Sequence, residues 1–500
     1  MTVKKTQQSL NATLKKTEQT LGSLENSLGN NVEASLLAIA ENSEGNDGLP
    51  EGWQLVDIDD ITFKGEQRKP EENEEIVYVD IGSIDRDKKI ISTPQQLLGK
   101  DAPSRARRVI TKGDVLVSLT RPNLNAVALV PEKYDGQFAS TGFEVLKPVG
   151  YDSRLLFSIT RSKSFIDSIS GTVQGALYPA AKSADVKSYE IPLPPLAEQT
   201  VIAQTLDTLL AQVDNIKTRL DAIPQILKTF RQSVLAAAVS GKLTEEWRGE
   251  NECELSAWVS SSIGDVATVA TGTTPKRTNL DYWTGGEIPW LTSASTGKSF
   301  TSEAEQFVTE LAVKEGRLKL FGPGTLLIAM YGEGKTRGQV TELKMTATCN
   351  QACAAIIVNE ETASKEFIKL RLIENYEETR KVAAGGAQPN LNLGKVREIP
   401  ISLPSLKEQT EIVRRVEELF AFADQIEQQV KNAQERVNNL TQSILAKAFR
   451  GELTAQWRAE NPDLITGENS AKALLAKIKE EREKLKPKKT NRKTAVRSQV

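Results

Sequence analysis

Residues 191–248 read IPLPPLAEQTVIAQTLDTLLAQVDNIKTRLDAIPQILKTFRQSVLAAAVSGKLTEEWR, and residues 401–458 read ISLPSLKEQTEIVRRVEELFAFADQIEQQVKNAQERVNNLTQSILAKAFRGELTAQWR. The two stretches align without a gap at an offset of 210 residues, and 22 of their 58 positions are identical. The chain therefore contains an internal repeat. Each copy follows a segment with its own interior sequence, module 1 (residues 49–190) and module 2 (residues 255–400). This order predicts a common scaffold that presents two different modules.

Each repeated stretch is predicted to form a long helix. Its apolar residues alternate spacings of four and three, a 3.5-residue period that is typical of a coiled-coil seam. An amphipathic helix packed on its own domain is the alternative, but strict heptads in two equivalent places favour mutual pairing. The predicted seam residues are Ile202, Leu206, Leu209, Val213, Ile216, Leu220, Ile412, Val416, Leu419, Ile426, Val430 and Val437.

The ends of these helices also carry signals. Prolines precede each start, and Gly241 and Gly451 stand where a C-terminal cap is expected. The apolar phase continues past Pro224, which predicts a kink rather than an end. Equivalent helices related by a twofold axis run antiparallel. About 40 helical residues span ~60 Å, so we expect a rod of fixed length with one module at each end.

The expected fold class is mixed α+β, with two α/β modules on an antiparallel coiled coil and internal pseudo-twofold symmetry. The modules contain short apolar runs broken by Gly, Pro and Asn, and each ends in a helical stretch. A polar N-terminal extension carries leucines at heptad-like spacing, and the C-terminus has a charged helix and a basic tail. The predicted domains are residues 1–48, 49–190, 191–248, 249–400, 401–460 and 461–500.

Composition excludes several classes of function. The 500 residues carry a net charge of −2, so DNA affinity would require local basic patches. The absence of histidine excludes Ser-His-Asp and Cys-His catalysis and histidine-ligated metals. Three cysteines indicate no disulfide framework and fit a reducing cytoplasm. No apolar run is long enough for a membrane span and no signal peptide is recognisable, so we expect a soluble, cytoplasmic protein without bound metal.

Residues 329–336 (AMYGEGKT) fit a relaxed phosphate-loop pattern, with Lys335 and Thr336 as the nucleotide-binding residues. The sequence RGQVTEL that follows does not predict the helix that such a loop requires. A nucleotide triphosphatase therefore stays an alternative, as does a coiled-coil scaffold without a DNA role. No adenine-methyltransferase motif and no glycine-rich cofactor loop were found, so no cofactor and no catalytic residue are expected on this chain.

Basic and amide-bearing loops recur in both modules and indicate DNA binding, since Arg and Lys contact guanine or phosphate and Asn contacts adenine. Solvated charged loops are the alternative for any single residue. The candidate DNA-binding residues are Arg105, Arg107, Arg108, Lys112, Arg121, Asn123, Asn125, Tyr178, Lys182, Lys276, Arg277, Tyr282, Tyr331, Lys335, Arg337, Gln388, Asn390 and Asn392.

The phrases PPLAEQ, PSLKEQ, LDTLLAQVD, GKLTEEWR and GELTAQWRAENPDL resemble the specificity (S) subunit of type I restriction-modification systems, most closely the type IA branch. The resemblance covers roughly residues 49–486. It implies that the modules are target-recognition domains, each reading half of a bipartite, asymmetric DNA sequence. It further implies two methyltransferase (M) subunits that use S-adenosylmethionine, restriction (R) subunits that use ATP and Mg²⁺, and no active centre on this chain. The extension 1–48 departs from the family pattern.

Overall fold

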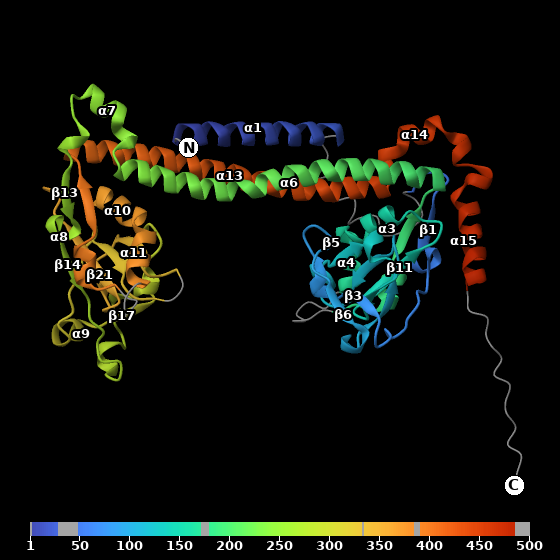
Figure 1. The fold of residues 1–500 in the computed structure, drawn as a ribbon, viewed down its shortest axis with the longest axis horizontal. Coiled ribbons are helices and arrows are strands. Elements are labelled where there is room, and N and C mark those ends of the chain that lie inside the picture. Colours follow the sequence, from blue (N-terminus) through green and yellow to red (C-terminus); the bar gives the residue numbers. More distant parts are fainter. Residues whose placement is uncertain (1–2, 29–48, 172–179, 333–334, 385–390, 486–500) are drawn as a thin grey trace, which may run out of the picture. The chain divides into compact units, whose positions relative to one another are not determined.

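The fold was obtained as a computed structural model that describes residues 3–28, 49–171, 180–332, 335–384 and 391–485 (Figure 1). The chain divides into two compact units. One comprises residues 1–16 and 220–432, and the other comprises residues 17–219 and 433–500. Each unit contains one module together with parts of both long helices.

The two long helices have equivalent bounds. Helix α6 (Leu196–Val239) and helix α13 (Leu406–Phe449) each contain 44 residues. Helix α6 continues through Pro224, so the prediction that this proline does not end the helix is confirmed. Gly241 and Gly451 follow the helices with φ of +74° and +70°, the left-handed conformation of a C-terminal cap. The repeat in the sequence is thus a repeat in secondary structure.

Within each unit the two helices pack antiparallel, and Figure 1 shows them side by side. In the unit with module 2, the Phe230 ring of α6 meets Phe422 of α13 edge-on, with centroids 6.1 Å apart. The neighbouring Arg231 pairs with Asp424 at 2.6 Å and with Glu427 at 3.0 Å. The end of one helix therefore lies against the start of the other, as the heptads predicted.

The predicted seam is buried at nearly every position. Ten of its twelve members are 3% exposed or less. The exceptions, Leu209 and Leu419, are half-buried, and they occupy equivalent positions in the repeat. In α6 the next residue, Leu210, is buried instead. At this point the buried apolar surface of α6 therefore extends beyond the predicted seam.

Module 1 consists of two four-stranded sheets, with orders β2-β11-β8-β9 and β6-β3-β10-β7. Their strands are β2 (Thr62–Phe63), β3 (Glu75–Val79), β6 (Gln95–Leu98), β7 (Ala106–Ile110), β8 (Val115–Ser118), β9 (Val127–Leu129), β10 (Gln137–Ser140) and β11 (Phe143–Pro148). The remaining elements are β1 (Gln54–Asp57), β4 (Ile84–Asp85), β5 (Ile90–Ile91), α3 (Ser153–Thr160), α4 (Lys163–Ser170), α5 (Ser183–Lys187) and β12 (Glu190–Leu193). Strands β1 and β12 pair antiparallel, which joins the two ends of the module beside α6.

Module 2 also contains two larger sheets, with five and three strands in place of four and four, and its side chains are unrelated. Its sheets have orders β14-β21-β18-β19-β16 and β17-β15-β20, and β13 pairs with β22 as β1 does with β12. The strands are β13 (Val259–Ser262), β14 (Ala267–Thr271), β15 (Ile288–Leu291), β16 (Phe300–Thr301), β17 (Gln306–Val308), β18 (Leu326–Ala329), β19 (Val340–Leu343), β20 (Thr348–Cys349), β21 (Cys353–Val358) and β22 (Pro400–Leu403). The helices are α8 (Ile263–Val266), α9 (Glu310–Glu315), α10 (Lys365–Glu374), α11 (Tyr376–Ala384) and α12 (Leu393–Arg397). The equivalent strands β8 and β18 follow Gly113 and Gly324.

Outside the modules, the described residues also form three further helices and the short α7 (Glu245–Glu250), which follows α6. Helix α1 (Val3–Leu28) buries its heptad leucines, and Arg436 of α13 pairs with Glu18 at 2.7 Å and Glu25 at 2.6 Å. Helix α14 (Ala455–Glu460) follows α13, and the predicted charged helix is α15 (Ala471–Leu485). Residues 29–48 and the basic tail after residue 485 lie outside the described residues. None of the helices in the described part of the chain is long and apolar enough to cross a membrane.

Candidate nucleic-acid interface

Several candidate residues gather at one end of module 1, which we call reading end 1. It consists of the β8–β9 hairpin loop (residues 119–126), the β10–β11 turn, and the chain that enters α5. Ala181 N donates to Leu119 O at 2.9 Å, and Leu119 N donates to Gly142 O at 2.9 Å. Thr141 N donates to Arg105 O at 2.9 Å. The backbone therefore brings together the segments that carry Arg105, Lys182 and the loop residues Arg121 and Asn123.

Module 2 forms an equivalent reading end 2. The β18–β19 hairpin loop (residues 330–339) meets the β20–β21 turn, because Met330 N donates to Ala352 O at 2.7 Å. Leu391 N donates to Met330 O at 3.2 Å, which adds the chain entering α12. The Thr274 hydroxyl lies 2.6 Å from the Gln351 side-chain oxygen, which adds the loop before β15. The candidates Lys276, Arg277, Tyr331, Lys335, Arg337 and Asn392 all lie on these joined segments.

The phosphate-loop alternative is not supported by this topology. Strands β18 and β19 pair antiparallel, with Leu326 opposite Glu342 and Ile328 opposite Val340. The motif therefore spans a hairpin, and no helix begins at Thr336 to direct its N-terminus at a phosphate. The positive φ of Gly332 serves the hairpin loop rather than a nucleotide cradle.

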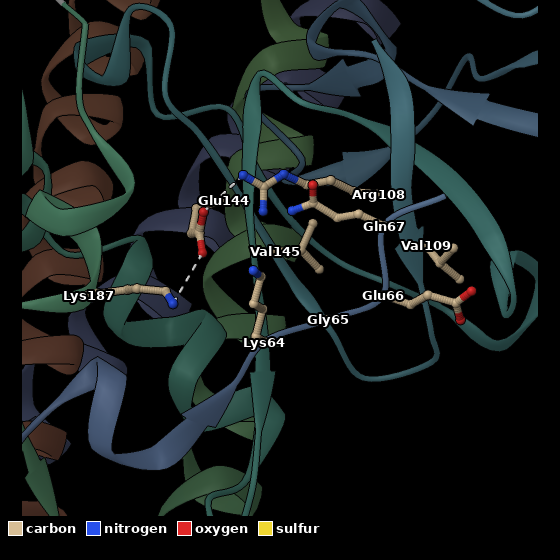
Figure 2. A pocket seen from close by; sticks show the side chains of 9 residues that line it. All are labelled: Lys64, Gly65, Glu66, Gln67, Arg108, Val109, Glu144, Val145 and Lys187. Atoms are coloured by element: carbon tan, nitrogen blue, oxygen red, sulfur yellow. Dashed lines mark ion pairs between the residues drawn. The ribbon is translucent and has the colours of Figure 1, made fainter. Parts of the chain in front are cut away.

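Three candidates in module 1 form contacts with other residues of the module. Asn125 is 8% exposed, and its side-chain amide donates to Thr160 O at 2.8 Å, so it holds the loop to α3. Lys112 lies at the other end of β8 and pairs with Glu132 at 2.9 Å. Arg108 faces a pocket in which Glu144 pairs with Arg108 at 3.2 Å and with Lys187 at 3.9 Å (Figure 2). Asn125 therefore has a structural role, whereas Lys112 and Arg108 stay candidate DNA-binding residues.

Other candidates are exposed or half-buried and are held at defined positions. The Arg277 guanidinium lies 3.9 Å from the ring centroid of Trp283 and 4.6 Å from that of Trp290, which fixes it on an aromatic surface. The Tyr282 hydroxyl donates to Glu315 at 2.9 Å, and this carboxylate raises the pKa of the phenol. In reading end 2, Arg337 has a buried Nε without a described partner. In module 1, the Arg107 Nε donates to Ser104 O at 3.0 Å. Tyr178, Gln388 and Asn390 lie outside the described residues.

Sequence reasoning missed residues that reach the reading ends from helix α11 and from the β4–β5 turn. The Tyr376 hydroxyl of α11 donates to Lys335 O at 2.6 Å, and Arg380 donates to the Tyr376 hydroxyl at 3.1 Å. The Lys89 ammonium donates to Asn125 O at 2.6 Å. These residues are far from the loops in the sequence and belong to no motif, so only the fold brings them there.

A buried carboxylate cluster, which we call latch 1, joins module 1 to the helices. Glu198, at the start of α6, is fully buried. It accepts hydrogen bonds from Trp53 Nε1 at 2.7 Å and Thr454 Oγ1 at 2.7 Å, and it pairs with Arg458 at 2.5 Å. Trp53 lies at the start of module 1, whereas Thr454 and Arg458 follow α13. A single carboxylate therefore connects the module, the start of α6 and the end of α13.

Latch 2 repeats this cluster around Glu408 at the start of α13. Glu408 accepts from Trp258 Nε1 at 2.9 Å and Thr244 Oγ1 at 2.7 Å, and it pairs with Arg248 at 2.7 Å. The repeated GKLT and GELT segments thus serve the helix of the other repeat. Each long helix is therefore held by residues that follow the other long helix, which agrees with the pseudo-twofold symmetry. The same contacts of Glu with Thr, Trp and Arg form in both latches, which explains why these residue types occur twice in the sequence.

The glutamine beside each latch glutamate binds the module on the same side. The Gln199 side-chain oxygen accepts from Asp152 N at 2.8 Å, and the Gln409 side-chain oxygen accepts from Ser364 N at 2.7 Å. In each module the donor is the residue directly before the first helix that follows the sheets, which is α3 in module 1 and α10 in module 2. The repeated Glu-Gln pair therefore fixes each module to the helices from two sides.

No group of three or more metal-ligating side chains occurs in the part of the chain that the structure describes. Cys349 and Cys353 are buried in β20 and β21, while Cys253 is exposed. The described geometry offers basic loops on two equivalent ends rather than a catalytic constellation.

Comparison with known proteins agrees with this architecture. Residues 50–225 and 256–436 match the family model described as "Type I restriction modification DNA specificity domain". The two matches cover more than half of the chain and contain the two modules. The chain belongs to this family. The resemblance predicted from the repeated phrases is thereby confirmed, and α1 lies before the first matched residue.

Two relatives from this family align over most of the chain. The type I restriction enzyme StySPI specificity subunit of Salmonella potsdam is 38% identical over 468 residues, which are 89% of this chain and 99% of the relative. The EcoKI specificity subunit of Escherichia coli (strain K12) is 36% identical over 466 residues, which are 89% and 98% of the two chains. The chain therefore contains nearly the full length of both specificity subunits.

Solved structures of the family share the fold. A chain solved in work on complex assembly and conformational transition of the type I R-M system has a TM-score of 0.68 at 26% identity, covering 81% of this chain and 99% of that one. The HsdS subunit from Thermoanaerobacter tengcongensis has a TM-score of 0.56 at 26% identity, covering 82% and 100%. The mixed α+β fold with paired long helices is therefore the fold of type I specificity subunits.

Proposed function

We propose that this specificity subunit recognises a bipartite, asymmetric DNA sequence, with one half contacted by reading end 1 and the other by reading end 2. The observation that carries the proposal is the equivalence of the two ends. Both gather a hairpin loop, a turn and a basic segment at the same place in one topology, with different side chains in the two modules. Two modules with different side chains on one scaffold favour two half-sites of different DNA sequence.

The proposed division of labour follows the family. Methyltransferase subunits would bind S-adenosylmethionine and methylate adenine N6, and restriction subunits would use ATP and Mg²⁺. The present chain would supply DNA recognition and the scaffold for these subunits, without a cofactor or an active centre of its own. We propose that the complex acts in the cytoplasm, where its DNA lies.

The paired helices suggest how the two half-sites are spaced. Latch 1 and latch 2 each fix a module to a helix start by a buried charge network. We propose that the length of α6 and α13 sets the number of unread base pairs between the half-sites.

Arginines on the two hairpin loops, the exposed Arg121 and the half-buried Arg337, provide the test of DNA recognition. Arg121→Ala is expected to weaken binding by about 1–3 kcal/mol if the side chain contacts a base, and Arg337→Ala by a similar amount. Binding of the target duplex to the complex with methyltransferase subunits would be measured by fluorescence anisotropy. Lys133→Gln, an exposed change at the other end of β8, is the control and leaves affinity within about twofold. Unchanged affinity and salt dependence in both arginine variants would contradict their role.

A further inference from the structure

A group of cations lies beside reading end 1, where the β4–β5 turn, the end of α3 and helix α6 meet. Lys89 forms the centre, and the charges of Arg86, Arg161 and Lys217 are close enough to lower its pKa. Lys217 also lies near Asp85, which connects α6 to the same turn. We call Arg86, Lys88, Lys89, Arg161 and Lys217 the basic patch.

The cations of the basic patch lack the ion pairs that are common elsewhere in the protein. In the described part of the chain, none of the five forms an ion pair with a carboxylate. Asp85 instead accepts from the backbone of Asp87 and Lys88, both at 3.0 Å. Asp214 acts on Arg161 only at longer range. The patch therefore keeps an excess of positive charge.

Lys89 is held in this patch at an energetic cost. Its φ of +58° is in the left-handed region, which a residue with a side chain rarely adopts. Its ammonium is half-buried, and burial together with the neighbouring cations lowers its pKa to about 8. The ammonium donates to Asn125 O at 2.6 Å, so the patch is continuous with the β8–β9 loop. Such strain and desolvation are typical of functional positions.

The second copy of the scaffold shows that the fold does not require this charge. The residue equivalent to Lys217 is Glu427, which pairs with Arg231 at 3.0 Å. The residue equivalent to Arg161 at the end of the first helix is Asn375, which donates to Thr379 at 3.0 Å. The same framework is therefore compatible with neutral or acidic side chains at these positions, so structural support does not explain the basic patch.

We propose that the basic patch binds the phosphodiester backbone of DNA immediately beside the half-site contacted by reading end 1. This inference rests on the proposed function, and it assigns backbone contacts to residues outside the reading loops. Phosphate oxygens would supply the anionic partners that Lys89, Arg161 and Lys217 lack in the chain. Backbone contacts of this kind contribute affinity and orientation but no sequence information.

The test uses the complex of the chain with its methyltransferase subunits and a mixed-sequence duplex of about 40 base pairs. Binding is measured by anisotropy between about 50 and 200 mM salt for wild type, Lys217→Glu, Arg161→Gln and Lys89→Gln. Each lost phosphate contact is expected to reduce the slope of log affinity against log salt by about 0.9, which corresponds to about tenfold weaker binding at 50 mM salt. Lys217→Glu copies the residue of the equivalent helix, so folding is expected to be preserved. Lys133→Gln is the matched control from the same module.

The pH dependence provides a second readout. Below pH 8 the Lys89 ammonium is mostly protonated in both the free and the DNA-bound protein. Above pH 8 the amine is mostly neutral in the free protein, so binding to phosphate requires the uptake of a proton. Affinity of the wild type should therefore fall from pH 7 to pH 9, and Lys89→Gln should remove this component. The groups that face Lys89 are Arg86, Asp87, Arg161 and Lys217.

Three results distinguish the outcomes. Uniform loss of affinity with a reduced salt slope in the patch variants supports the proposal. Unchanged DNA affinity and slope in folded variants overturn it, and a selective loss of methyltransferase subunits would assign the patch to an acidic protein surface instead. If the wild-type complex itself shows no salt-dependent DNA binding, the proposed function fails as well.

Discussion

Replacing Glu408 by alanine is expected to lower the free energy of unfolding of its unit by about 3–5 kcal/mol. Glu408 is 3% exposed, and the substitution leaves the guanidinium of Arg248, itself 6% exposed, without its counter-charge. Trp258 Nε1 and Thr244 Oγ1 lose their acceptor at the same time. Removing one partner of a buried pair costs far more than the pair contributes, because an uncompensated charge remains. Denaturant unfolding followed by tryptophan fluorescence would measure the change.

The chain offers a matched comparison for this prediction. Glu198→Ala should cause a loss of similar size, because latch 1 has the same donors at nearly the same distances. Glu418→Ala removes an exposed carboxylate of α13 that pairs with Arg414, and it should cost at most about 1 kcal/mol. Equal effects of Glu408→Ala and Glu418→Ala would show that the latch does not hold the module.

Shortening both long helices by one heptad is expected to change the spacing of the DNA target without changing its halves. A heptad keeps the seam residues facing each other and shortens the helices by about 10 Å. At 3.4 Å per base pair this corresponds to a spacer that is about three base pairs shorter. Seven residues would be removed from α6 and seven facing residues from α13, and methylated sites would be mapped by sequencing.

A companion variant with one heptad added to each helix should lengthen the spacer by a similar amount. Replacing an exposed residue between seam positions, without a change of length, is the control and should leave the target intact. Altered half-sites with an unchanged spacer would contradict the proposal that these helices set the distance.

Local rules were sufficient to predict the scaffold. The apolar heptads of α6 and α13 and the capping glycines at 241 and 451 depend only on neighbouring residues. The heptad spacing and the turn preference of the glycines can therefore be recognised in a single sequence. The hairpin at 119–126 was predictable for the same reason. The half-buried position of Leu209 was not, because Leu210 is buried in its place and the apolar spacing does not distinguish the two leucines.

The latches and the contacts of the reading ends could not be predicted in this way. Glu198 meets Arg458 across 260 positions, and Lys89 meets the loop at Asn125 across 36 positions. Glu198 and Gly241 recur at equivalent positions of the second repeat, but repetition did not indicate which repeat supplies each partner. Asn125 had the residue type of a base-contacting side chain, but its burial depends on the position of Thr160 in α3. Such roles depend on tertiary contacts rather than on residue type.

We propose above all that two unlike modules on one chain contact two separate half-sites. The most direct test of this proposal is genome-wide mapping of N6-methyladenine in cells that express this chain together with its methyltransferase subunit. We expect one asymmetric motif, with two different halves separated by a constant number of unspecified base pairs. A continuous motif, two identical halves, or methylation that does not depend on this chain would contradict it.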